Sequence, residues 1–369
     1  MTAQRPTRPG RATLQTIADQ VGVSRMTVSN AFSRPDQLSP GLRRQILAAA
    51  DALSYAGPDP AARALARGAT GAIGVLLTDS LTPAFTDEVA AELLGAIAAE
   101  LAPTGLALTL LTSSGREDII PARDVAIDGA LVYSCETDSP AVDWLVRRRM
   151  PLVFIDQEPA AGSTCINIDD RAAARAVAQH VVDLGHRRIA IVTASLVGPH
   201  GVLADPAPTA SSYVARQRMC GWLDALNPVG AEAVMIQQPY SEFSAGFDSA
   251  RCVLDTEDPV TAILCLSDVM ARGVVEGAQS LGLRVPDDVS VAGFDDSPVA
   301  SRMHPTLTTV RQDVAAKGRA AASALIEAIA RRRDGSTPEG EHVLLATETV
   351  IRESTGPVRR LATGRRPAR

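Results

Sequence analysis

The sequence lacks the features of membrane, exported and disulfide-bonded proteins. No run reaches the roughly 18 consecutive apolar residues that a membrane helix needs, and no apolar segment follows the basic N-terminus as an export signal would require. The five cysteines are widely spaced and form no CxxC pair, so we expect reduced thiols in or near the core, with neither a disulfide nor a zinc site. These absences predict a cytoplasmic protein with no membrane partner.

Catalytic and cofactor motifs are missing as well. The chain contains no GxSxG elbow, no P-loop glycine pattern and no HExxH, and its five histidines have no spacing typical of a metal site. We therefore predict no catalytic residue, no metal and no cofactor. An enzyme on a parallel α/β scaffold remains an alternative, which turnover of a sugar or nucleoside would support.

The charges are divided unevenly along the chain. Residues 1–70 hold nine arginines and four acidic residues, a net charge of +5, whereas the remaining residues carry a net charge of −11. This division indicates that only the N-terminal part meets a polyanion, although a solvated run of charges would look the same. At 369 residues, with 46% apolar and 21% charged residues, the chain can form one small and one large globular unit.

Two short amphipathic helices are predicted near the N-terminus. The first runs from Leu14 to about Gln20, with Thr13 as its N-cap and Gly22 ending it in a left-handed conformation. Ser24 caps a second helix after a tight turn. This is the helix-turn-helix pattern, although another small helical domain could show it too.

Two further helices complete this segment. One begins at Pro40 after the cap Ser39 and places on its core face the apolar residues Leu42, Ile46, Leu47, Ala50 and Leu53. The other follows Asp59 and ends at Gly68. Two turns of helix are unstable alone in water, so we expect this last helix to need a partner, most naturally its copy in a dimer on DNA.

Several motifs together resemble the lactose/galactose-repressor family. They are TLQTIA at 13–18, GVS at 22–24, TVS at 27–29, AARAL at 61–65, IGV at 73–75, GFDD at 293–296 and PTLTTV at 305–310. The match covers nearly the whole chain. It implies a sequence-specific DNA-binding transcriptional regulator, which we predict to be a repressor that binds operator DNA as a homodimer and responds to a small polar effector, sugar or nucleoside-like.

The resemblance also implies roles for residues of the headpiece. Arg25, Met26 and Asn30 occupy the positions that read base edges in the major groove, and Thr27 and Ser29 are placed for phosphates. Leu65 stands where the family wedges a leucine from each hinge helix into the minor groove. One departure is an extra residue, Gly57, ahead of the hinge.

From residue 72 onward, short runs rich in Val, Ile and Leu alternate with helical stretches, which is typical of buried parallel strands with crossover helices. The predicted strands are 72–77, 106–111, 130–133, 152–155, 189–193, 262–266 and 289–294. Ligands bind beyond the carboxyl ends of such strands, and the polar candidates there are Asp79, Ser80, Asp156, Gln157, Ser267, Asp268 and Asp295, together with nearby Phe85 and with Arg218 on a later helix.

The family resemblance implies that Arg218, Ser267 and Asp295 bind the effector, to which we add Ser80, Phe85 and Gln157. A guanidinium and a carboxylate can share neighbouring hydroxyls of a polyol. Alternatively, Arg218 and Asp295 neutralise each other, or Asp295 and Asp296 cap a turn. Trp222 could stack on a ligand or fill the core, and we favour the core.

The sequence thus predicts an all-α helix-turn-helix headpiece with a hinge helix, followed by an α/β bilobed, periplasmic-binding-protein-like sensor domain with two parallel sheets. Its parts are a disordered arm (1–12), a DNA-binding domain (13–57), a hinge helix (58–70), an effector-binding and dimerisation domain (71–355) and a disordered basic tail (356–369). The tail has no leucine heptad, so we predict no tetramerisation coil. The segment 195–212 is either an effector-specific lid or a disordered insert. A solute-binding protein for transport is the rival of similar shape, which the headpiece and the lack of an export signal disfavour.

Overall fold

The computed structural model describes residues 12–77, 81–112, 120–134, 139–160, 162–195, 198–203, 212–336 and 340–358. The chain divides into two compact units, Met1–Gly71 and Ala72–Arg369. The predicted arm and tail lie almost wholly outside the described residues, as does much of segment 195–212. None of the described helices is long and apolar enough to cross a membrane.

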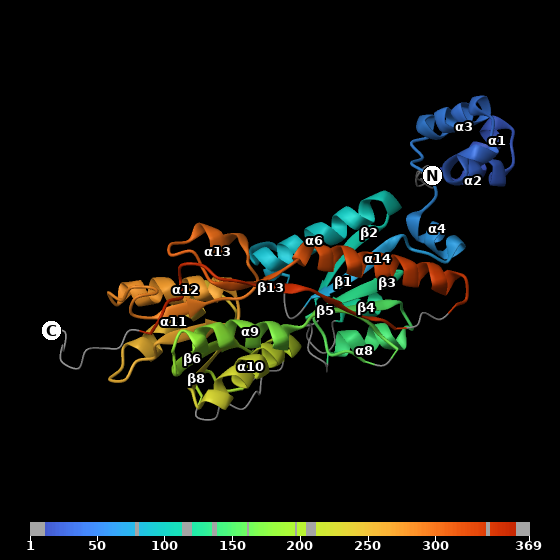
Figure 1. Ribbon diagram of the computed structural model, residues 1–369. Coiled ribbons are helices and arrows are strands. Elements are labelled where there is room, and N and C mark those ends of the chain that lie inside the picture. Colours follow the sequence, from blue (N-terminus) through green and yellow to red (C-terminus); the bar gives the residue numbers. More distant parts are fainter. Residues whose placement is uncertain are drawn as a thin grey trace, which may run out of the picture. The chain divides into compact units, whose positions relative to one another are not determined.

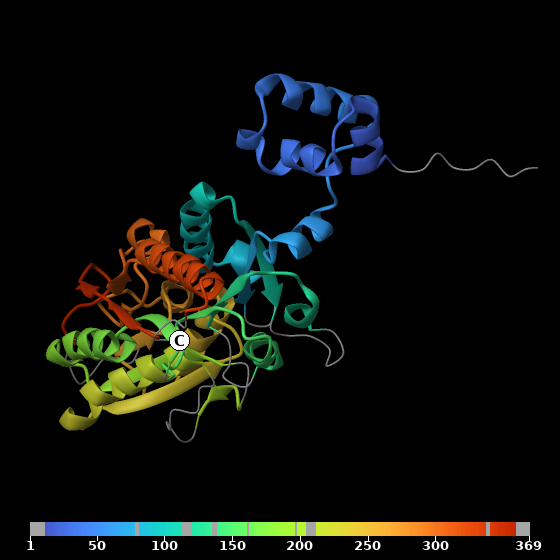
Figure 2. The same ribbon diagram turned by 90° about the vertical axis from the view of Figure 1, so that its right-hand side faces the viewer.

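The first unit is all-helical, and its helices begin where the predicted caps stand. The side chains of Thr13, Ser24 and Ser39 each accept a hydrogen bond from a backbone amide of the first helical turn. Gly22 ends the first helix in the left-handed conformation, as predicted. The elements, in blue in Figure 2, are α1 (Leu14–Val21), α2 (Arg25–Ser33), the 3-10 turn η1 (Pro35–Gln37), α3 (Pro40–Ala52) and α4 (Pro60–Arg67).

A small apolar core holds α1, α2 and α3 together. Its buried members are Ile17, Ala18, Val28, Ala31, Ile46 and Ala50. Leu47, which we predicted on the core face, does not join this cluster. It follows Ile46 directly and is therefore turned about 100° away around the helix.

The larger unit contains two lobes, each built on its own sheet (Figure 1). In lobe 1 all strand pairs are parallel and the order is β12-β5-β4-β3-β1-β2. Its strands are β1 (Ala72–Leu77), β2 (Ala107–Thr112), β3 (Gly129–Tyr133), β4 (Leu152–Ile155), β5 (Thr164–Ile168) and β12 (His342–Leu345). Its helices are α5 (Pro83–Thr86), α6 (Glu88–Leu101), η2 (Ala102–Thr104), α7 (Pro121–Asp124), α8 (Pro140–Arg147) and α14 (Val314–Arg333). Two separate apolar clusters, one with α6 and α14 and one with α7 and α8, bury the sheet on its two faces.

Lobe 2 has the strand order β10-β9-β6-β8-β7, in which only β7 runs antiparallel to its neighbour. The strands are β6 (Arg188–Ala194), β7 (Gly201–Val202), β8 (Glu232–Gln238), β9 (Ala262–Cys265) and β10 (Ser290–Ala292). The helices are α9 (Asp170–Asp183), α10 (Tyr213–Leu226), η3 (Asn227–Val229), α11 (Phe243–Leu254), α12 (Asp268–Ser280) and α13 (Pro298–Arg302). The step from β6 to β8 runs opposite to the steps β8 to β9 and β9 to β10, so right-handed crossovers put α10 on one face and α11 and α12 on the other.

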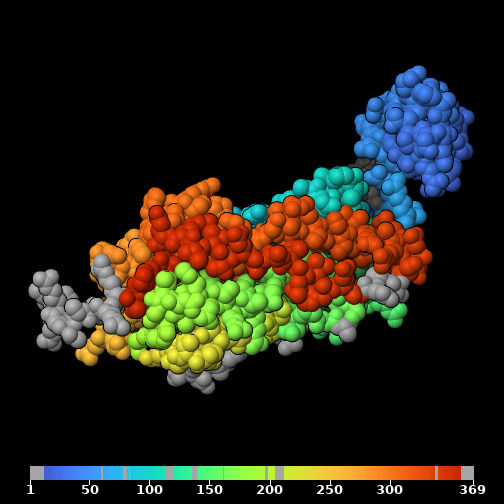
Figure 3. All heavy atoms as spheres, viewed as in Figure 1, coloured from blue at the N-terminus to red at the C-terminus, as the bar shows by residue number. Residues whose placement is uncertain are grey.

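The chain crosses between the lobes three times. It leaves lobe 1 after β5, returns through β11 (Thr309–Gln312) into α14, and crosses again from β12 into β13 (Thr347–Val350). Strands β11 and β13 pair antiparallel. Figure 3 shows α14 and the C-terminal strands, in orange and red, as a continuous band along one face of this unit.

The predicted two-sheet parallel architecture is confirmed, with differences in detail. The predicted strand 289–294 is only three residues long, because its end turns away into the loop that carries Asp295. Strands β5, β7, β8, β11, β12 and β13 were not predicted. Trp222 is buried in the core of lobe 2, as we favoured. Among the cysteines, Cys165 and Cys265 are buried and Cys220 is half-buried, whereas Cys252 is exposed on α11, contrary to expectation.

Candidate functional site

Arg218 on α10 is the centre of a buried charged cluster in lobe 2. Its Nε donates to Asp170 Oδ1 at 2.8 Å, and its Nη1 donates to the Leu266 carbonyl at 2.6 Å and to Asp295 Oδ1 at 3.3 Å. The guanidinium carbon also lies 3.5 Å from the centre of the Phe294 ring. These contacts fix the orientation of the guanidinium.

The cluster continues across the crossing strand β11 into lobe 1. Gln312 Nε2 donates to Asp295 Oδ1 at 2.8 Å, and Gln312 Oε1 accepts from Lys317 Nζ at 2.8 Å. Lys317, on α14, also donates to Asp156 Oδ1 at 2.7 Å. One hydrogen-bonded chain therefore joins Asp170 of lobe 2 to Asp156 of lobe 1, and Gln312 is the link between the lobes.

Two carboxylates of this chain sit on strained backbone. Asp156, directly after β4, has φ of 56°, and Asp295, shortly after β10, has φ of 114°. Non-glycine residues rarely adopt positive φ, and such strain costs about 1–3 kcal/mol per residue. Both positions lie at the carboxyl ends of parallel strands, where ligands bind in this kind of sheet.

Burial dominates the ionisation of the carboxyl groups. Burial raises the pKa of Asp295 to about 6, although Arg218 opposes the rise and Asp87 adds to it. It also raises the pKa of Asp170, again against Arg218, and the pKa of Asp87, whose carboxylate caps α6 by accepting from the Ala90 amide. For Arg218, burial alone would lower the pKa, but Asp295 and Asp170 more than offset it. The carboxyl groups thus repel one another, and Arg218 holds them together.

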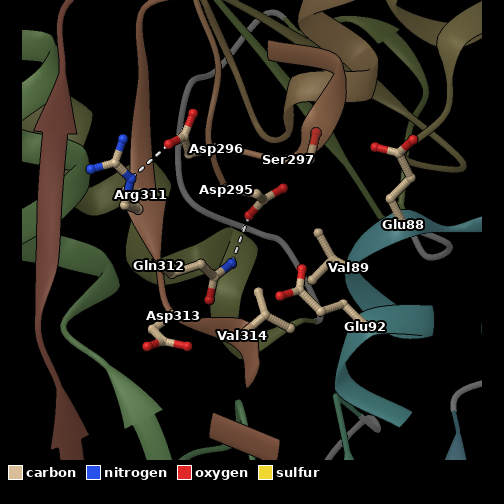
Figure 4. A pocket seen from close by; sticks show the side chains of 10 residues that line it. All are labelled: Glu88, Val89, Glu92, Asp295, Asp296, Ser297, Arg311, Gln312, Asp313 and Val314. Atoms are coloured by element: carbon tan, nitrogen blue, oxygen red, sulfur yellow. Dashed lines mark hydrogen bonds and ion pairs between the residues drawn. The ribbon is translucent and has the colours of Figure 1, made fainter. Parts of the chain in front are cut away.

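A cavity of about 260 Å³ opens beside this network. Figure 4 shows Asp295 and Gln312 pointing toward one another at its wall, with Glu88, Val89 and Glu92 of α6 on the opposite side. The remaining lining residues are Asp296, Ser297, Arg311, Asp313 and Val314.

Several polar atoms of the network have unused hydrogen-bonding capacity within the described part of the chain. Asp295 Oδ2 and Arg218 Nη2 have no hydrogen-bond partner there. The ammonium of Lys317 uses two of its three N–H groups. Asp170 Oδ2 is buried without a partner. Both acceptors and donors are therefore available to a polar ligand.

The other predicted effector residues are placed less directly. Ser80 and Asp79 lie outside the described residues. Phe85 is 73% exposed on the short helix α5 and is not part of the cavity wall. The Ser267 side chain caps α12 and contacts the Ser241 hydroxyl at 2.7 Å, so it is already engaged. Gln157 is buried, and its backbone exchanges two hydrogen bonds with the side chain of Asn167.

Neighbouring acidic residues have structural contacts. Asp268 accepts from the Thr309 hydroxyl at 2.6 Å and from the Ser297 amide at 2.8 Å, which ties the start of α12 to strand β11 and to the start of α13. Asp296 pairs with Arg352 at 2.6 Å and with Arg311 at 2.7 Å. The alternative that Asp295 and Asp296 only cap a turn does not describe these contacts, because the Asp296 carboxylate forms ion pairs and the Asp295 carboxylate binds Arg218 and Gln312.

Sequence reasoning missed Asp170, Gln312 and Lys317. Asp170 starts α9 after an unpredicted strand, and nothing local distinguishes it. Gln312 lies two residues beyond the PTLTTV motif that we quoted. Lys317 could have been singled out from the composition, because it is the single lysine of the chain.

In the headpiece, the residues predicted to meet bases are displayed on one helix. Arg25 is exposed on the first turn of α2 and has no hydrogen-bond or ion-pair partner among the described residues, and Met26 is 69% exposed. Asn30 and Ser29 are half-buried, and Asn30 donates to Gln37 Oε1 at 3.2 Å. The Thr27 hydroxyl lies 2.8 Å from that of Ser24 and so belongs to the helix cap.

Helix α4 presents Leu65 to solvent. The carboxylate of Asp59 accepts from the amides of Ala61 and Ala62, and Gly68 ends the helix in the left-handed conformation. Leu65 is 87% exposed. An apolar side chain held out in this way is available to a partner surface.

Comparison with known proteins assigns both units. Residues 13–57 match the family described as "Bacterial regulatory proteins, lacI family", and residues 178–355 match "Periplasmic binding protein-like domain". An HTH-type transcriptional regulator of Mycolicibacterium smegmatis is 35% identical over 375 residues, covering 95% of this chain and 98% of the relative.

Two solved structures extend the likeness. The lac repressor dimer bound to operator and the anti-inducer ONPF has 25% identity and a TM-score of 0.74, covering 94% of this chain and 99% of that one. The transcriptional regulator CelR in complex with cellobiose has 27% identity and a TM-score of 0.66, covering 93% of this chain and 100% of that one.

Proposed function

The chain belongs to the lacI family of bacterial regulatory proteins and is a DNA-binding transcriptional regulator, and on that premise we propose that it is a repressor controlled by a small polyhydroxylated effector. The effector, a sugar or nucleoside-like compound, binds in the sensor body next to Asp295 and Arg218. Its binding changes the affinity of the headpiece for operator DNA.

The observation that carries the proposal is the unused hydrogen-bonding capacity around the Arg218–Asp295 pair. A hydroxyl group is both donor and acceptor, so neighbouring hydroxyls of one effector can donate to Asp295 Oδ2 and accept from Arg218 Nη2. The pair is already oriented by Asp170 and Gln312, which reduces the ordering cost of binding. The CelR–cellobiose complex supports a carbohydrate as the class of effector.

The remaining candidates have supporting roles in the proposal. Gln157, whose backbone is held by Asn167, faces the effector from lobe 1. Ser267 gives up its contact with Ser241 and binds an effector oxygen instead. Ser80 and Phe85 approach the effector from the segment after β1.

For the DNA side, we assign residues 13–57 to operator recognition, 58–70 to the hinge and 71–355 to effector binding and dimerisation. Arg25, Met26 and Asn30 contact base edges, Thr27 and Ser29 contact phosphates, and Leu65 enters the minor groove. Two chains related by a two-fold axis then read the two halves of a near-palindromic operator. A single α4 is too short to persist alone, and its copy in the dimer supplies the contact that it lacks.

The effector acts by population shift. A compound that binds one lobe arrangement more tightly than another favours that arrangement, and the operator affinity changes by the same coupling free energy. Gln312 is the natural site of this coupling, because it joins Asp295 of lobe 2 to Lys317 of lobe 1.

The test begins with selection of DNA fragments by the purified full-length protein. The best fragment is then titrated at fixed salt with cellobiose, ribose, glucose and inosine, with fluorescence anisotropy as the readout. A short palindrome released or tightened by one of these compounds supports the proposal. A palindrome that no compound affects would refute the effector class, and the absence of any selected palindrome would refute operator binding.

A further inference from the structure

Lys317 is the only lysine in a chain with 35 arginines. All other cationic side chains are arginine, including the surface ion pairs on α10, α12 and α14. The exception is 2% exposed and belongs to the network beside the cavity. In a sequence that otherwise uses arginine throughout, this position indicates a requirement that a guanidinium does not meet.

The difference between the two cations is geometric. Lysine offers a compact ammonium with three donors arranged tetrahedrally, whereas the guanidinium of arginine is a planar fork on a longer side chain. At the next residue, Gly318, a Cβ would lie 2.8 Å from the Cβ of Ala96, so α14 packs closely against α6 at this point. The contacts of the side chain, at 2.7 Å to Asp156 and 2.8 Å to Gln312, are those of a compact ammonium.

The ammonium is only partly satisfied. Two of its N–H groups go to Asp156 Oδ1 and Gln312 Oε1, and the third has no partner in the part of the chain that the structure describes. Leaving a donor of a buried ion unmatched is unfavourable, and a buried ion pair is itself weak evidence for a stabilising role. An acceptor supplied by a ligand would complete the set.

The surroundings indicate what kind of acceptor this is. Lys317 is one hydrogen bond behind Gln312, which lines the cavity, and Asp156 follows the carboxyl end of β4. The network contains two cations, Lys317 and Arg218, and three carboxyl groups, Asp156, Asp170 and Asp295. Asp87, outside the network, adds a further negative charge that raises the pKa of Asp295. An anionic ligand would add to this excess of negative charge, whereas the oxygen of a neutral compound would not.

We propose that Lys317 is a specificity-determining residue, which donates its third N–H to an uncharged oxygen of the effector. It distinguishes effectors that carry a hydroxyl or ring oxygen at this place from those that lack one, and it disfavours phosphorylated or carboxylated analogues. This inference rests on the proposed effector site.

The single lysine makes a direct test possible. Growth on 15N-lysine gives the full-length protein one labelled ammonium, so its 1H–15N signal reports Lys317 alone. Cellobiose, ribose, glucose and inosine are added in turn, with glucose 6-phosphate as the anionic analogue. We expect the signal to shift with the same apparent Kd that calorimetry gives for the compound that binds. A bound compound that leaves the signal unchanged at saturation would overturn the inference.

Variants give a second readout. Lys317→Met keeps the approximate volume and should weaken binding of the active compound about 10- to 150-fold, the usual loss for a hydrogen bond to a charged group. Lys317→Arg should not restore the binding of this compound to the wild-type level. Arg319→Met, on the exposed side of the same helix, is the matched control and should bind as the wild type does.

The outcomes separate the two proposals. Wild-type affinity in Lys317→Met, or binding of glucose 6-phosphate in preference to glucose, refutes the role of Lys317 but leaves the effector site standing. If none of the compounds binds the wild type, the proposed effector class fails and this inference fails with it. If Lys317→Met does not fold, the 1H–15N signal of Lys317 in the wild type still tests whether the bound compound contacts this residue.

Discussion

The headpiece and the sensor body present their polar groups in opposite ways. In the headpiece, Arg25 and Leu65 are exposed on short helices before any DNA is bound. In the body, Arg218 and Asp295 are buried and already bonded to protein groups. DNA supplies its own charge and grooves, so the headpiece needs only to display side chains. An effector must enter an existing network, so its affinity depends on how well it uses the donors and acceptors that the network leaves unpaired.

The largest expected effect concerns the body. Arg218→Ala leaves Asp170 and Asp295 buried without their cation, and should lower the free energy of unfolding by about 3–5 kcal/mol. Urea unfolding followed by tryptophan fluorescence measures this selectively, because both tryptophans lie in the second unit. Arg216→Ala removes a part-exposed pair from the same helix and should cost no more than about 1 kcal/mol. Similar losses of unfolding free energy in the two variants would mean that the buried network stabilises the fold no more than the part-exposed ion pair does.

The next effect separates binding from folding. Asp295→Asn should weaken effector binding by about 1.5–3 kcal/mol, or roughly 10- to 150-fold, because the acceptor for an effector hydroxyl loses its charge. Operator affinity without effector should stay near that of the wild type. Calorimetry and anisotropy measure the two affinities, and a parallel fall in both would contradict the division of roles.

The same carboxyl group predicts a pH dependence. Its pKa is raised to about 6 in the effector-free protein, and the ionised form is the one that accepts from the effector. The effector affinity of the wild type should therefore fall as the pH drops through about 6, approaching tenfold per pH unit below it. In Asp295→Asn this dependence should disappear. Titrations between about pH 5 and pH 8 measure it, and an unchanged slope in the variant would assign the titration to another group.

A comparable effect is expected on the DNA side. Leu65→Ala should weaken operator binding by about 1.5–3 kcal/mol, the value of burying a leucine side chain, and leave effector binding unchanged. Leu65→Met retains the apolar length and is the matched control. Anisotropy at one salt concentration gives the affinities. Wild-type operator binding by Leu65→Ala would exclude the minor-groove role.

The smallest effect is the most specific. Arg25→Ala should cost about 1–3 kcal/mol of operator affinity and relax the preference at one base pair of each half-site. Arg34→Ala, at the exposed end of the same helix, should leave the base preference intact. Repeating the DNA selection with each variant measures the preference. If both variants select the wild-type sequence, the base contact belongs to another residue.

Local chemistry was readable from the sequence. The caps Thr13, Ser24 and Ser39 act through amides three residues away, and Gly22 acts through its own backbone, so each was predictable from a short window. The apolar runs that became β1 and β4 are buried by helices within the same lobe. Nearby helices such as α6 supply part of this cover, whereas α14 comes from far along the chain. These strands were predictable because their own residues form short apolar runs.

The buried charged network could not be predicted from short stretches of sequence. Asp170 is 48 residues from Arg218, and Asp156 is 161 residues from Lys317. No periodicity or spacing links partners over such separations, and only the fold brings them together. Strand β8 was missed for another reason: its apolar run is only the four residues 233–236, between a glutamate and two glutamines, and its first residues are not fully buried.

The three crossings between the lobes affect how this chain can be recombined in evolution. The headpiece is one uninterrupted stretch of the gene, so a single junction near residue 71 could exchange it for another. Each lobe, by contrast, is assembled from separate stretches, because α14 and β12 return to lobe 1 after lobe 2 has been traversed. No single junction transfers one lobe intact. New operator preferences can therefore be acquired by swapping a module, whereas a new effector preference has to arise by substitutions within the network itself.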